Sequence, residues 1–414
     1  MKITDNKLYL GDIPVDTIMQ EYGSPLYVYE ESVLRSQFRK LSAGFPRGLL
    51  EIHYAMKANS NPSLLRILAE EGSSIDAVSE FEVRLALESG FEANQIIFTG
   101  NNNTLREIEF CVEQNVSVNL GSLALLEKYG ERYPETTVSL RVNPGIGAGH
   151  HSHCITGGPD SKFGVYYDQI ETALSLAKKY KLTINGIHSH IGTGIFSAEP
   201  MLEAMEMILD VAKVFPDLQF VDFGGGFGIP YKPEQLPLDM EDLSKKMTER
   251  FTNFIQHYGR DLLMKIEPGR LLIGPVGVLL ATVTNITNTP KNSFVGVDTG
   301  FNHLVRPTMY GSYHKILNAN RISSTEKDVV VVGNICESGD ILSRSGDDFI
   351  RKLSSPAIDD RLAFLDAGAY GFSMSSQYNF RPRPAEVLVH QGQSRLIRRA
   401  ETFDDLSQCF VDFN

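Results

Sequence analysis

A lysine follows an apolar, β-branched run near the N-terminus. Lys57 lies in the segment H-Y-A-M-K-A-N, directly after the run L-L-E-I-H-Y-A-M at residues 49–56. A lysine at the end of a buried strand is partly desolvated, which makes its amine available to form a Schiff base. The same position also suits a surface lysine that begins a loop. The spacing alone leaves both interpretations open.

Two further segments contain groups that could hold an anion. Residues 224–228 read G-G-G-F-G, and glycines such as Gly225 and Gly226 let backbone N–H groups approach a phosphate closely. A tight turn is the alternative, and the G-x-G-x-x-G spacing of a dinucleotide site is absent. The segment Glu267-Pro268-Gly269-Arg270 adds a carboxylate and a guanidinium three residues apart, which could equally form a surface ion pair of little energetic value.

Two segments of the chain contain several closely spaced histidines. In H-S-H-I-G-T-G, His188 and His190 share one face of a predicted strand, and Thr193 follows them. We expect His190 at the site and His188 buried and hydrogen-bonded rather than a metal ligand. The second group has the composition of a metal site, but its Gly- and Ser-rich surroundings and the lack of a second ligand cluster lead us to predict no metal. This group comprises His150, His151, His153 and Cys154.

The second half of the chain contains a different set of reactive side chains. Cys336-Glu337-Ser338-Gly339-Asp340 follows the apolar run D-V-V-V-V-G-N-I, so Cys336 is either a proton donor or a buried structural cysteine. Arg306 and Tyr310 are one helical turn apart, which suits the binding of a carboxylate. Tyr370, in D-A-G-A-Y-G, ends another predicted strand.

Eight apolar runs alternate with helical patterns between residues 49 and 268 and predict eight parallel strands, each followed by a helix. Pro62 near the start of one helix, and Ser79 with Glu82 as a capping box in another, support the assignment. Eight such units in succession favour a (β/α)₈ barrel, whose catalytic residues follow the strands. The predicted strands are residues 49–56, 73–79, 96–100, 117–121, 138–143, 184–190, 218–224 and 262–268.

From about residue 276 the pattern changes to strands separated by turns, with one predicted helix at 303–318. The first 27 residues also contain strand-like runs, K-L-Y-L and P-L-Y-V-Y-E. We therefore predict an α/β protein of two domains. Residues 28–275 form the barrel, and residues 1–27 together with 276–414 form a mostly β domain.

Composition excludes several classes of protein. The 414 residues carry 39 Lys and Arg against 51 Asp and Glu, a net charge of −12, which argues against binding nucleic acid or an anionic membrane surface. No run approaches the 18 or so apolar residues of a membrane span, and the N-terminal segment lacks the apolar core of a signal peptide. Four widely spaced cysteines suit a reducing compartment, and we predict a cytoplasmic protein.

Taken together, the motifs resemble those of the diaminopimelate decarboxylase family, pyridoxal-phosphate enzymes of the alanine racemase-like fold related to ornithine decarboxylase. The resemblance covers nearly the whole chain in the expected order. It implies the decarboxylation of meso-2,6-diaminopimelate to L-lysine and CO₂, the last step of lysine biosynthesis. The motifs are Y-A-M-K-A-N, H-I-G-T-G, G-G-G-F-G, E-P-G-R, R-P-x-x-Y, C-E-S-G-D, G-A-Y and R-P-R-P-A-E.

The resemblance also implies a role for each residue of the site. Lys57 would hold pyridoxal phosphate covalently, His190 would stack on its ring, and Glu267 would face its pyridine nitrogen. Cys336 would protonate the α-carbon from a loop that reaches across a homodimer. Binding of the cofactor phosphate and its surroundings is implied for Thr193, Gly225, Gly226, Gly269, Arg270 and Tyr370. Recognition of the distal end of the amino-acid substrate is implied for Arg270, Arg306, Tyr310, Glu337 and Tyr370.

Three alternatives remain at this point. A decarboxylase of the same fold could act on ornithine, lysine, arginine or carboxynorspermidine, although Arg270, Arg306 and Tyr310 favour a substrate with a distal carboxylate. A racemase would need a second catalytic base, typically tyrosine, where this chain offers Cys336. A non-enzymatic pyridoxal-phosphate carrier would normally be a barrel alone, and an inactive regulator would be expected to lose Lys57 or Cys336.

Overall fold

The computed structural model describes residues 1–149, 151 and 155–411. Two compact units are present. One comprises residues 37–229 and 236–272, and the other comprises residues 1–36, 230–235 and 273–414. The predicted division near residues 28 and 275 remains our proposal for the domain boundaries.

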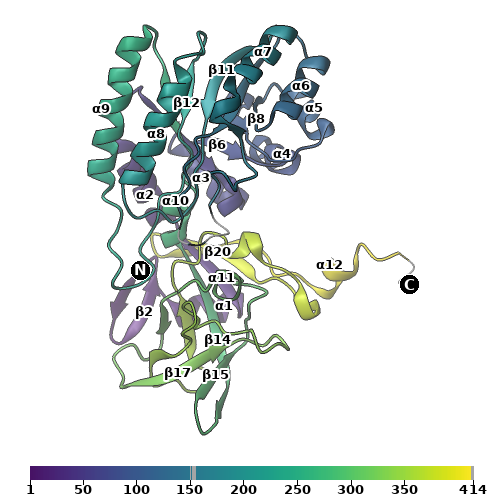
Figure 1. Ribbon diagram of the computed structural model, residues 1–414. Coiled ribbons are helices and arrows are strands. Elements are labelled where there is room, and N and C mark those ends of the chain that lie inside the picture. The colour runs from purple at the N-terminus through teal and green to yellow at the C-terminus, as the bar shows by residue number, and fades with distance from the viewer. Residues whose placement is uncertain (150, 152–154, 412–414) are drawn as a thin grey trace. The chain divides into compact units, whose positions relative to one another are not determined.

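The unit of residues 37–229 and 236–272 is a closed parallel barrel (Figure 1). Its strands pair in sequence order, and the ring closes because β13 pairs with β5. All eight predicted strands are confirmed, and the short β10 (Val165–Tyr166) pairs in parallel with β9 outside the ring. The barrel strands are β5 (Leu50–Ala55), β6 (Ser74–Ala77), β7 (Ile96–Phe98), β8 (Ser117–Leu120), β9 (Thr137–Asn143), β11 (Thr183–His188), β12 (Phe220–Asp222) and β13 (Leu263–Ile266).

Helices follow the strands and pack around the ring. Pro62 is the first residue of its helix, as predicted, with Asn61 as the N-cap. Ser79 caps the next helix through the Glu82 N–H, while the Glu82 carboxylate accepts a hydrogen bond from Val78 rather than from Ser79. The helices are α2 (Glu31–Ala43), which begins in the other unit, α3 (Pro62–Glu70), α4 (Glu80–Glu88), α5 (Leu105–Glu113), α6 (Leu123–Arg132), α7 (Ile170–Tyr180), α8 (Glu199–Ala212), α9 (Met240–Tyr258) and α10 (Arg270–Ile273).

The second unit is mostly β, as predicted, and it takes in the N-terminal strands. β4 (Leu26–Glu30) pairs antiparallel with β14 (Gly277–Asn288) and parallel with β20 (Ala385–His390). The remaining strands of this sheet are β15 (Ser293–Val297), β16 (Ile316–Asn318), β17 (Glu326–Val332), β18 (Arg351–Ser354), β19 (Arg361–Phe364) and β21 (Gln393–Arg398). A separate small sheet contains β1 (Lys2–Thr4), β2 (Lys7–Leu10) and β3 (Ile13–Pro14).

Apolar side chains of the small sheet pack on the large one. Leu8 and Leu10 share one buried cluster with Val278, Leu280 and Val387, so burial of these side chains fixes the N-terminal segment to this unit. Among its described residues the unit also contains the α-helices α1 (Val15–Tyr22), α11 (Arg306–Tyr310) and α12 (Phe403–Ser407).

The single helix predicted at 303–318 is wrong in extent. Only α11 is helical there, and residues Ile316–Asn318 form β16. Gly311 ends the helix with a left-handed φ of 60°, and its N–H closes the last turn on the Arg306 carbonyl. Among the described residues, no helix is long and apolar enough to cross a membrane.

Candidate active site

Lys57 lies directly after β5, in the one-turn helix η1 (Met56–Ala58) at the carboxyl end of the barrel. Its Nζ is 2.6 Å from Oδ2 of Asp76, the last residue but one of the neighbouring strand β6. The other oxygen of Asp76 accepts a hydrogen bond from the Thr99 hydroxyl. The Lys57 side chain is 39% exposed whereas that of Asp76 is fully buried, so the lysine pairs with a buried carboxylate and remains accessible to solvent.

His190 is held by the glycine turn that follows the next strand. The Gly225 N–H donates to Nδ1 of His190 at 3.0 Å, so this nitrogen is an acceptor without a proton. The Thr156 hydroxyl donates to the His190 carbonyl at 2.9 Å. Burial, and then the positive charge of Arg141, hold the pKa of His190 well below its usual range. The ring is therefore neutral and fixed in orientation.

The glycine turn at 224–226 needs glycine for space as well as conformation. Gly224 and Gly226 have φ angles of +67° and +98°, which side chains other than glycine rarely adopt. A Cβ atom on Gly225 would lie 2.0 Å from the carbonyl oxygen of Glu267. In addition, the Glu267 N–H donates to the Gly224 carbonyl at 2.8 Å. The turn therefore packs closely against the segment that follows β13.

Gly269 and Arg270 come next along the segment that follows β13. A Cβ on Gly269 would meet the side chain of Ala58 at 3.0 Å, which brings the segment after β13 against the loop of Lys57. Arg270 is buried at the start of α10. Thr193 lies half-buried in the loop between β11 and α8. All the predicted site residues of the barrel therefore follow strands at one end of the ring.

Glu267 belongs to a buried cluster with His188 and Asp222. Nε2 of His188 is 3.1 Å from Oε2 of Glu267, so His188 is buried and hydrogen-bonded as predicted. Oδ1 of Asp222 accepts the Gly224 N–H at 2.8 Å. One oxygen on each carboxylate, Oε1 of Glu267 and Oδ2 of Asp222, has no hydrogen-bond partner among the described residues.

Ligand atoms of these three residues lie within 4.8 Å of one another, and the His188–Glu267 hydrogen bond accounts for the contact between two of them without a metal ion. The sequence spacing did not indicate carboxylates near His188, and the closed barrel places two there. Of the histidine-rich loop predicted not to bind metal, His150, His153 and Cys154 lie outside the described residues.

The barrel interior contains charged residues that sequence reasoning missed. Arg141 on β9 is buried, and its guanidinium lies over the Phe163 ring, 4.5 Å from the centroid. Burial lowers the pKa of Arg141, while the carboxylates of Glu267, Asp76 and Asp222 oppose this effect. Single charged residues within apolar strand runs, such as S-I-D-A and V-S-L-R-V-N, were the available signal. Such residues are rare in buried strands unless they are paired.

The remaining predicted residues lie on the mostly β unit. Arg306 is fully buried, with Nη1 3.0 Å from Nε2 of His314 and the guanidinium 4.7 Å from the centroid of the Tyr231 ring. Tyr310 is half-buried at the end of α11. Tyr370 is also half-buried and has a φ of +57°, an unusual conformation for a residue other than glycine.

Cys336 is exposed and carries a free thiol, so the buried structural interpretation is wrong. It follows β17 in a turn organised by Asp340, whose carboxylate accepts the N–H groups of Ile335 at 2.8 Å and Phe301 at 2.7 Å. Asn379 accepts the Cys336 N–H at 2.8 Å. Glu337, next along the turn, is exposed as well. These bonds fix the backbone on both sides of a thiol that faces outward.

The barrel residues fit pyridoxal phosphate. The accessible amine of Lys57 suits its aldehyde, and the buried Glu267 oxygen without a partner among the described residues suits its protonated pyridine nitrogen. A glycine turn, packed on the segment that also contains the buried Arg270, suits its phosphate. The site and the barrel thus define a pyridoxal-phosphate enzyme. Residues 31–274 match the family described as "Pyridoxal-dependent decarboxylase, pyridoxal binding domain".

Full-length relatives define the family more closely. The chain is 44% identical to a diaminopimelate decarboxylase of Methanothermobacter thermautotrophicus (96% of this chain, 94% of that protein). It is 37% identical to that of Escherichia coli (93% of each). The crystal structure of the Helicobacter pylori diaminopimelate decarboxylase complexed with L-lysine matches with a TM-score of 0.87 and 32% identity (95% of this chain, 98% of that chain). The chain belongs to the diaminopimelate decarboxylase family.

Proposed function

We propose that the protein removes CO₂ from meso-2,6-diaminopimelate and releases L-lysine. One arrangement carries the proposal. The half-exposed amine of Lys57 stands at the barrel mouth, while the buried Glu267 presents an oxygen that no described residue occupies. When bound, pyridoxal phosphate supplies the sink for the electron pair left by the departing CO₂. The protein must hold that group, keep its nitrogen protonated and deliver a proton to the substrate.

Residues of the barrel would hold the cofactor and keep its pyridine nitrogen protonated. Lys57 would hold the cofactor through its side-chain amine. Glu267, as a carboxylate, favours the protonated form of the pyridine nitrogen. The neutral ring of His190, fixed by the Gly225 N–H, would support the ring of the bound cofactor. The glycine turn, Thr193, Gly269, Arg270 and Tyr370 would hold its phosphate and the groups around it.

The β unit supplies substrate recognition and the final proton. Diaminopimelate carries a second carboxylate and a second amine at its distal end. A guanidinium and a phenol, from Arg306 and Tyr310, suit that carboxylate, together with Arg270 and Tyr370, and the carboxylate of Glu337 suits the amine. The exposed thiol of Cys336 then protonates the α-carbon from which CO₂ has left, so that the product is an amino acid with one carboxylate fewer.

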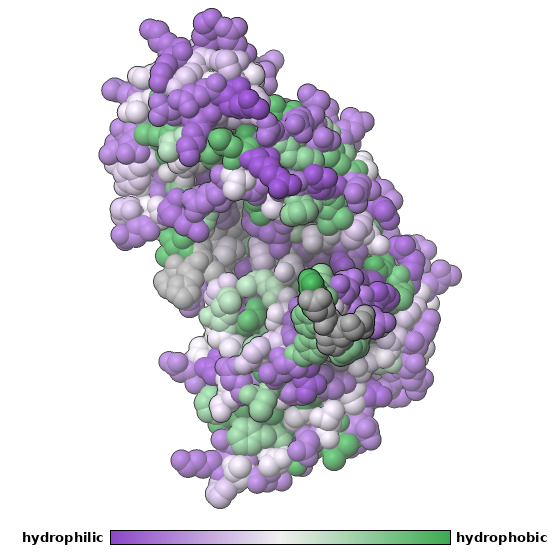
Figure 2. Space-filling view, turned by 90° about the vertical axis from the view of Figure 1, so that its right-hand side faces the viewer, coloured by the Kyte–Doolittle hydropathy of each residue, from purple (hydrophilic) through white to green (hydrophobic). Residues whose placement is uncertain are grey.

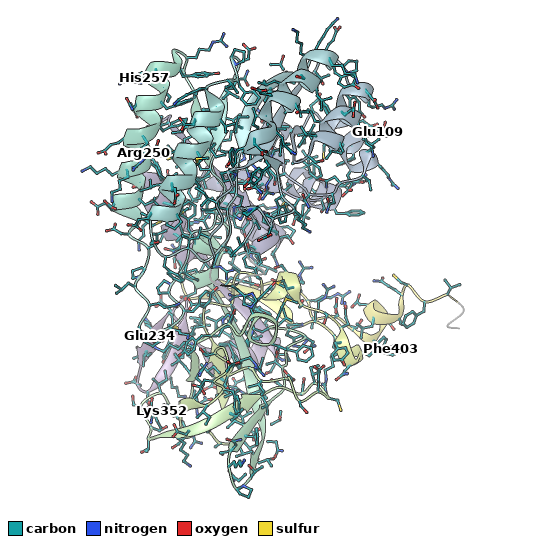
Figure 3. The ribbon with its side chains drawn as sticks, in the orientation of Figure 1. Glu109, Glu234, Arg250, His257, Lys352 and Phe403 are labelled. Carbon is teal, nitrogen blue, oxygen red and sulfur yellow. The ribbon has the colours of Figure 1, made fainter. Side chains whose placement is uncertain are left out.

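We propose further that two copies of the chain form a homodimer with shared sites. The Cys336 N–H donates a hydrogen bond to Asn379, which directly precedes Phe380. Phe380, Phe403 and Phe410 are exposed aromatic residues. Phe380 contacts both Phe403 on α12 and Phe410, at 5.9 and 6.2 Å between ring centroids. Figure 3 labels Phe403, and Figure 2 shows hydrophobic groups between hydrophilic ones on the face toward the C-terminal end. Exposed apolar surface of this kind is typical of protein contacts.

Among the described residues, the three free cysteines Cys111, Cys336 and Cys409 suit a reducing compartment, and we propose that the enzyme works in the cytoplasm. The acidic balance of the chain gives no support to nucleic acid or an anionic membrane as a partner.

A substrate panel tests the specificity. The holoenzyme should release CO₂ from meso-diaminopimelate with a kcat/KM well above that for L-lysine, L-ornithine or L-arginine, which lack a distal carboxylate. A preference for one of the latter three would identify instead a decarboxylase of the same fold with a different substrate.

A further inference from the structure

The hydrogen bond between His188 and Glu267 assigns the proton on the His188 ring. Burial, and then the charge of Arg141, hold the pKa of His188 well below its usual range, so the ring is neutral and carries a single proton. Nδ1 is buried with no hydrogen-bond partner among the described residues, whereas Nε2 faces Oε2 of Glu267 at 3.1 Å. The proton therefore belongs on Nε2, where it is donated to the carboxylate.

Asp222 determines where the negative charge of the cluster lies. Two carboxyl groups this close cannot both ionise readily in a buried site. Burial, and then repulsion from Glu267, raise the pKa of Asp222 well above its usual range. The pKa of Glu267 is also raised by burial, but Lys57 and Arg141 oppose that effect. Glu267 also accepts the hydrogen bond from Nε2 of His188, so the geometry and the nearby positive charges both favour the negative charge of the pair on Glu267.

Asp222 also fixes the backbone on which Glu267 stands. Its Oδ1 accepts the Gly224 N–H, and the Gly224 carbonyl accepts the Glu267 N–H, each at 2.8 Å. A continuous chain of hydrogen bonds thus runs from the Asp222 carboxyl group through the glycine turn to the residue that bears the active carboxylate. The other charged and titratable groups that interact electrostatically with this cluster are His53, Lys57, Asp76, Arg141, His190 and Lys265.

We propose that His188 is a positioning residue, whose Nε2–H hydrogen bond keeps Glu267 an ionised acceptor with only Oε1 left for the pyridine nitrogen. This inference rests on the proposed role of Glu267. A hydrogen bond donated to a carboxylate stabilises its charged form. Without that bond Glu267 becomes more basic, and the proton between it and the pyridine nitrogen moves toward the carboxylate. A less protonated pyridine is a poorer electron sink, so decarboxylation slows.

Two variants of His188 separate the hydrogen bond from mere packing. In His188→Gln the side-chain amide can place an N–H near the position of Nε2, whereas His188→Leu fills similar space without a donor. The wild type, both variants and Glu267→Gln are loaded with pyridoxal phosphate labelled with ¹⁵N in the ring. The ¹⁵N resonance of the bound cofactor reports directly whether the nitrogen is protonated. Thermal unfolding of each protein without cofactor checks that the fold is intact.

We expect the His188→Leu resonance to move from the protonated toward the unprotonated position, and the His188→Gln resonance to stay near that of the wild type. Loss of one hydrogen bond to a charged group should lower kcat about tenfold or more, with little change in KM. If His188→Leu fails to bind the cofactor, His188→Asn replaces it, because the shorter amide does not reach Glu267.

The control variant Glu267→Gln tests the role of Glu267 separately from the role of His188. If its resonance moves while that of His188→Leu does not, the role of His188 is wrong and that of Glu267 stands. Equal shifts in His188→Leu and His188→Gln would also overturn the hydrogen bond as the cause. If Glu267→Gln leaves the resonance protonated, the assignment of Glu267 itself fails.

Discussion

Nζ of Lys57 lies 2.6 Å from Oδ2 of Asp76, a carboxylate with no exposed surface near the end of the neighbouring strand. The two residues are 19 positions apart in the chain, and only the parallel pairing of β5 with β6 brings them together. The ion pair anchors the amine at the mouth of the barrel before any cofactor arrives. The position of the Lys57 amine is therefore set by the protein itself.

Lys57→Ala tests the attachment point. The variant should lose the absorbance band of the Schiff base between pyridoxal phosphate and the protein, because that band requires the covalent link to the Lys57 amine, and any cofactor that still binds should absorb as the free aldehyde. Borohydride treatment should fix the cofactor to the wild type and not to the variant. Lys213→Ala, which removes an exposed lysine paired with Asp210, should retain both properties. Persistence of the band in Lys57→Ala would identify another lysine as the attachment point.

Gly225→Ala tests the packing of the glycine turn. The added Cβ would lie 2.0 Å from the Glu267 carbonyl oxygen, so the turn must move away from the segment that holds Glu267. Overpacking of this kind costs about 1–3 kcal/mol, and we expect a lower unfolding temperature and much weaker binding of pyridoxal phosphate. Gly121→Ala is the control, because its Cβ would have no neighbour closer than 3.9 Å. Normal cofactor affinity in Gly225→Ala would show that the turn does not hold the cofactor.

Cys336→Ala tests the proton donor and, in a mixture, the shared site. Loss of a positioned general acid should lower kcat by about 10²–10⁴, while Cys409→Ala should leave it unchanged. Mixing inactive Cys336→Ala with inactive Lys57→Ala should restore activity, since a mixed dimer with shared sites contains one site with both groups intact. If exchange of subunits is demonstrated and no activity returns, each site must be built from a single chain. An unchanged rate in Cys336→Ala alone would remove this thiol from the mechanism.

The sequence allowed the barrel, its strand order and the residues after each strand to be predicted, because those features follow from short-range patterns. Lys57, His190 and Glu267 lie at or directly after the ends of predicted strands, and all three follow observed strands at one end of the ring. The partners of these residues could not be predicted in this way. Asp76, Arg141 and Asp222 lie within or at the ends of apolar strands. Their proximity to Lys57 and Glu267 depends on which strands pair when the ring closes. The helix predicted at 303–318 failed because one glycine, Gly311, stops it.

Glu82 provides a prediction about pH. Burial raises the pKa of Glu82 to about 7 from an ordinary value of 4.5. A carboxyl group with a raised folded-state pKa contributes stability that is present below about pH 4.5 and is lost as the pH rises through about 7. Glu82→Gln keeps an oxygen for the Val78 N–H but cannot ionise, so between pH 5 and 8 the unfolding temperature of the cofactor-free variant should change less than that of the wild type.

Glu88→Gln is the matched control for that measurement, because Glu88 is exposed on the same helix. Its pH profile should follow the wild type. If the Glu82→Gln profile also follows the wild type, Glu82 does not titrate in this range.

Product analysis with meso-diaminopimelate tests the central claim most directly. The protein loaded with pyridoxal phosphate is incubated with the substrate in deuterium oxide, and CO₂ and amino acids are quantified together. We predict that CO₂ and lysine form in equal amounts, with one deuterium at the carbon that lost the carboxylate, and that Lys57→Ala forms neither. Recovery of diaminopimelate that has exchanged its α-hydrogen or changed its stereochemistry, without release of CO₂, would indicate a racemase and contradict the account.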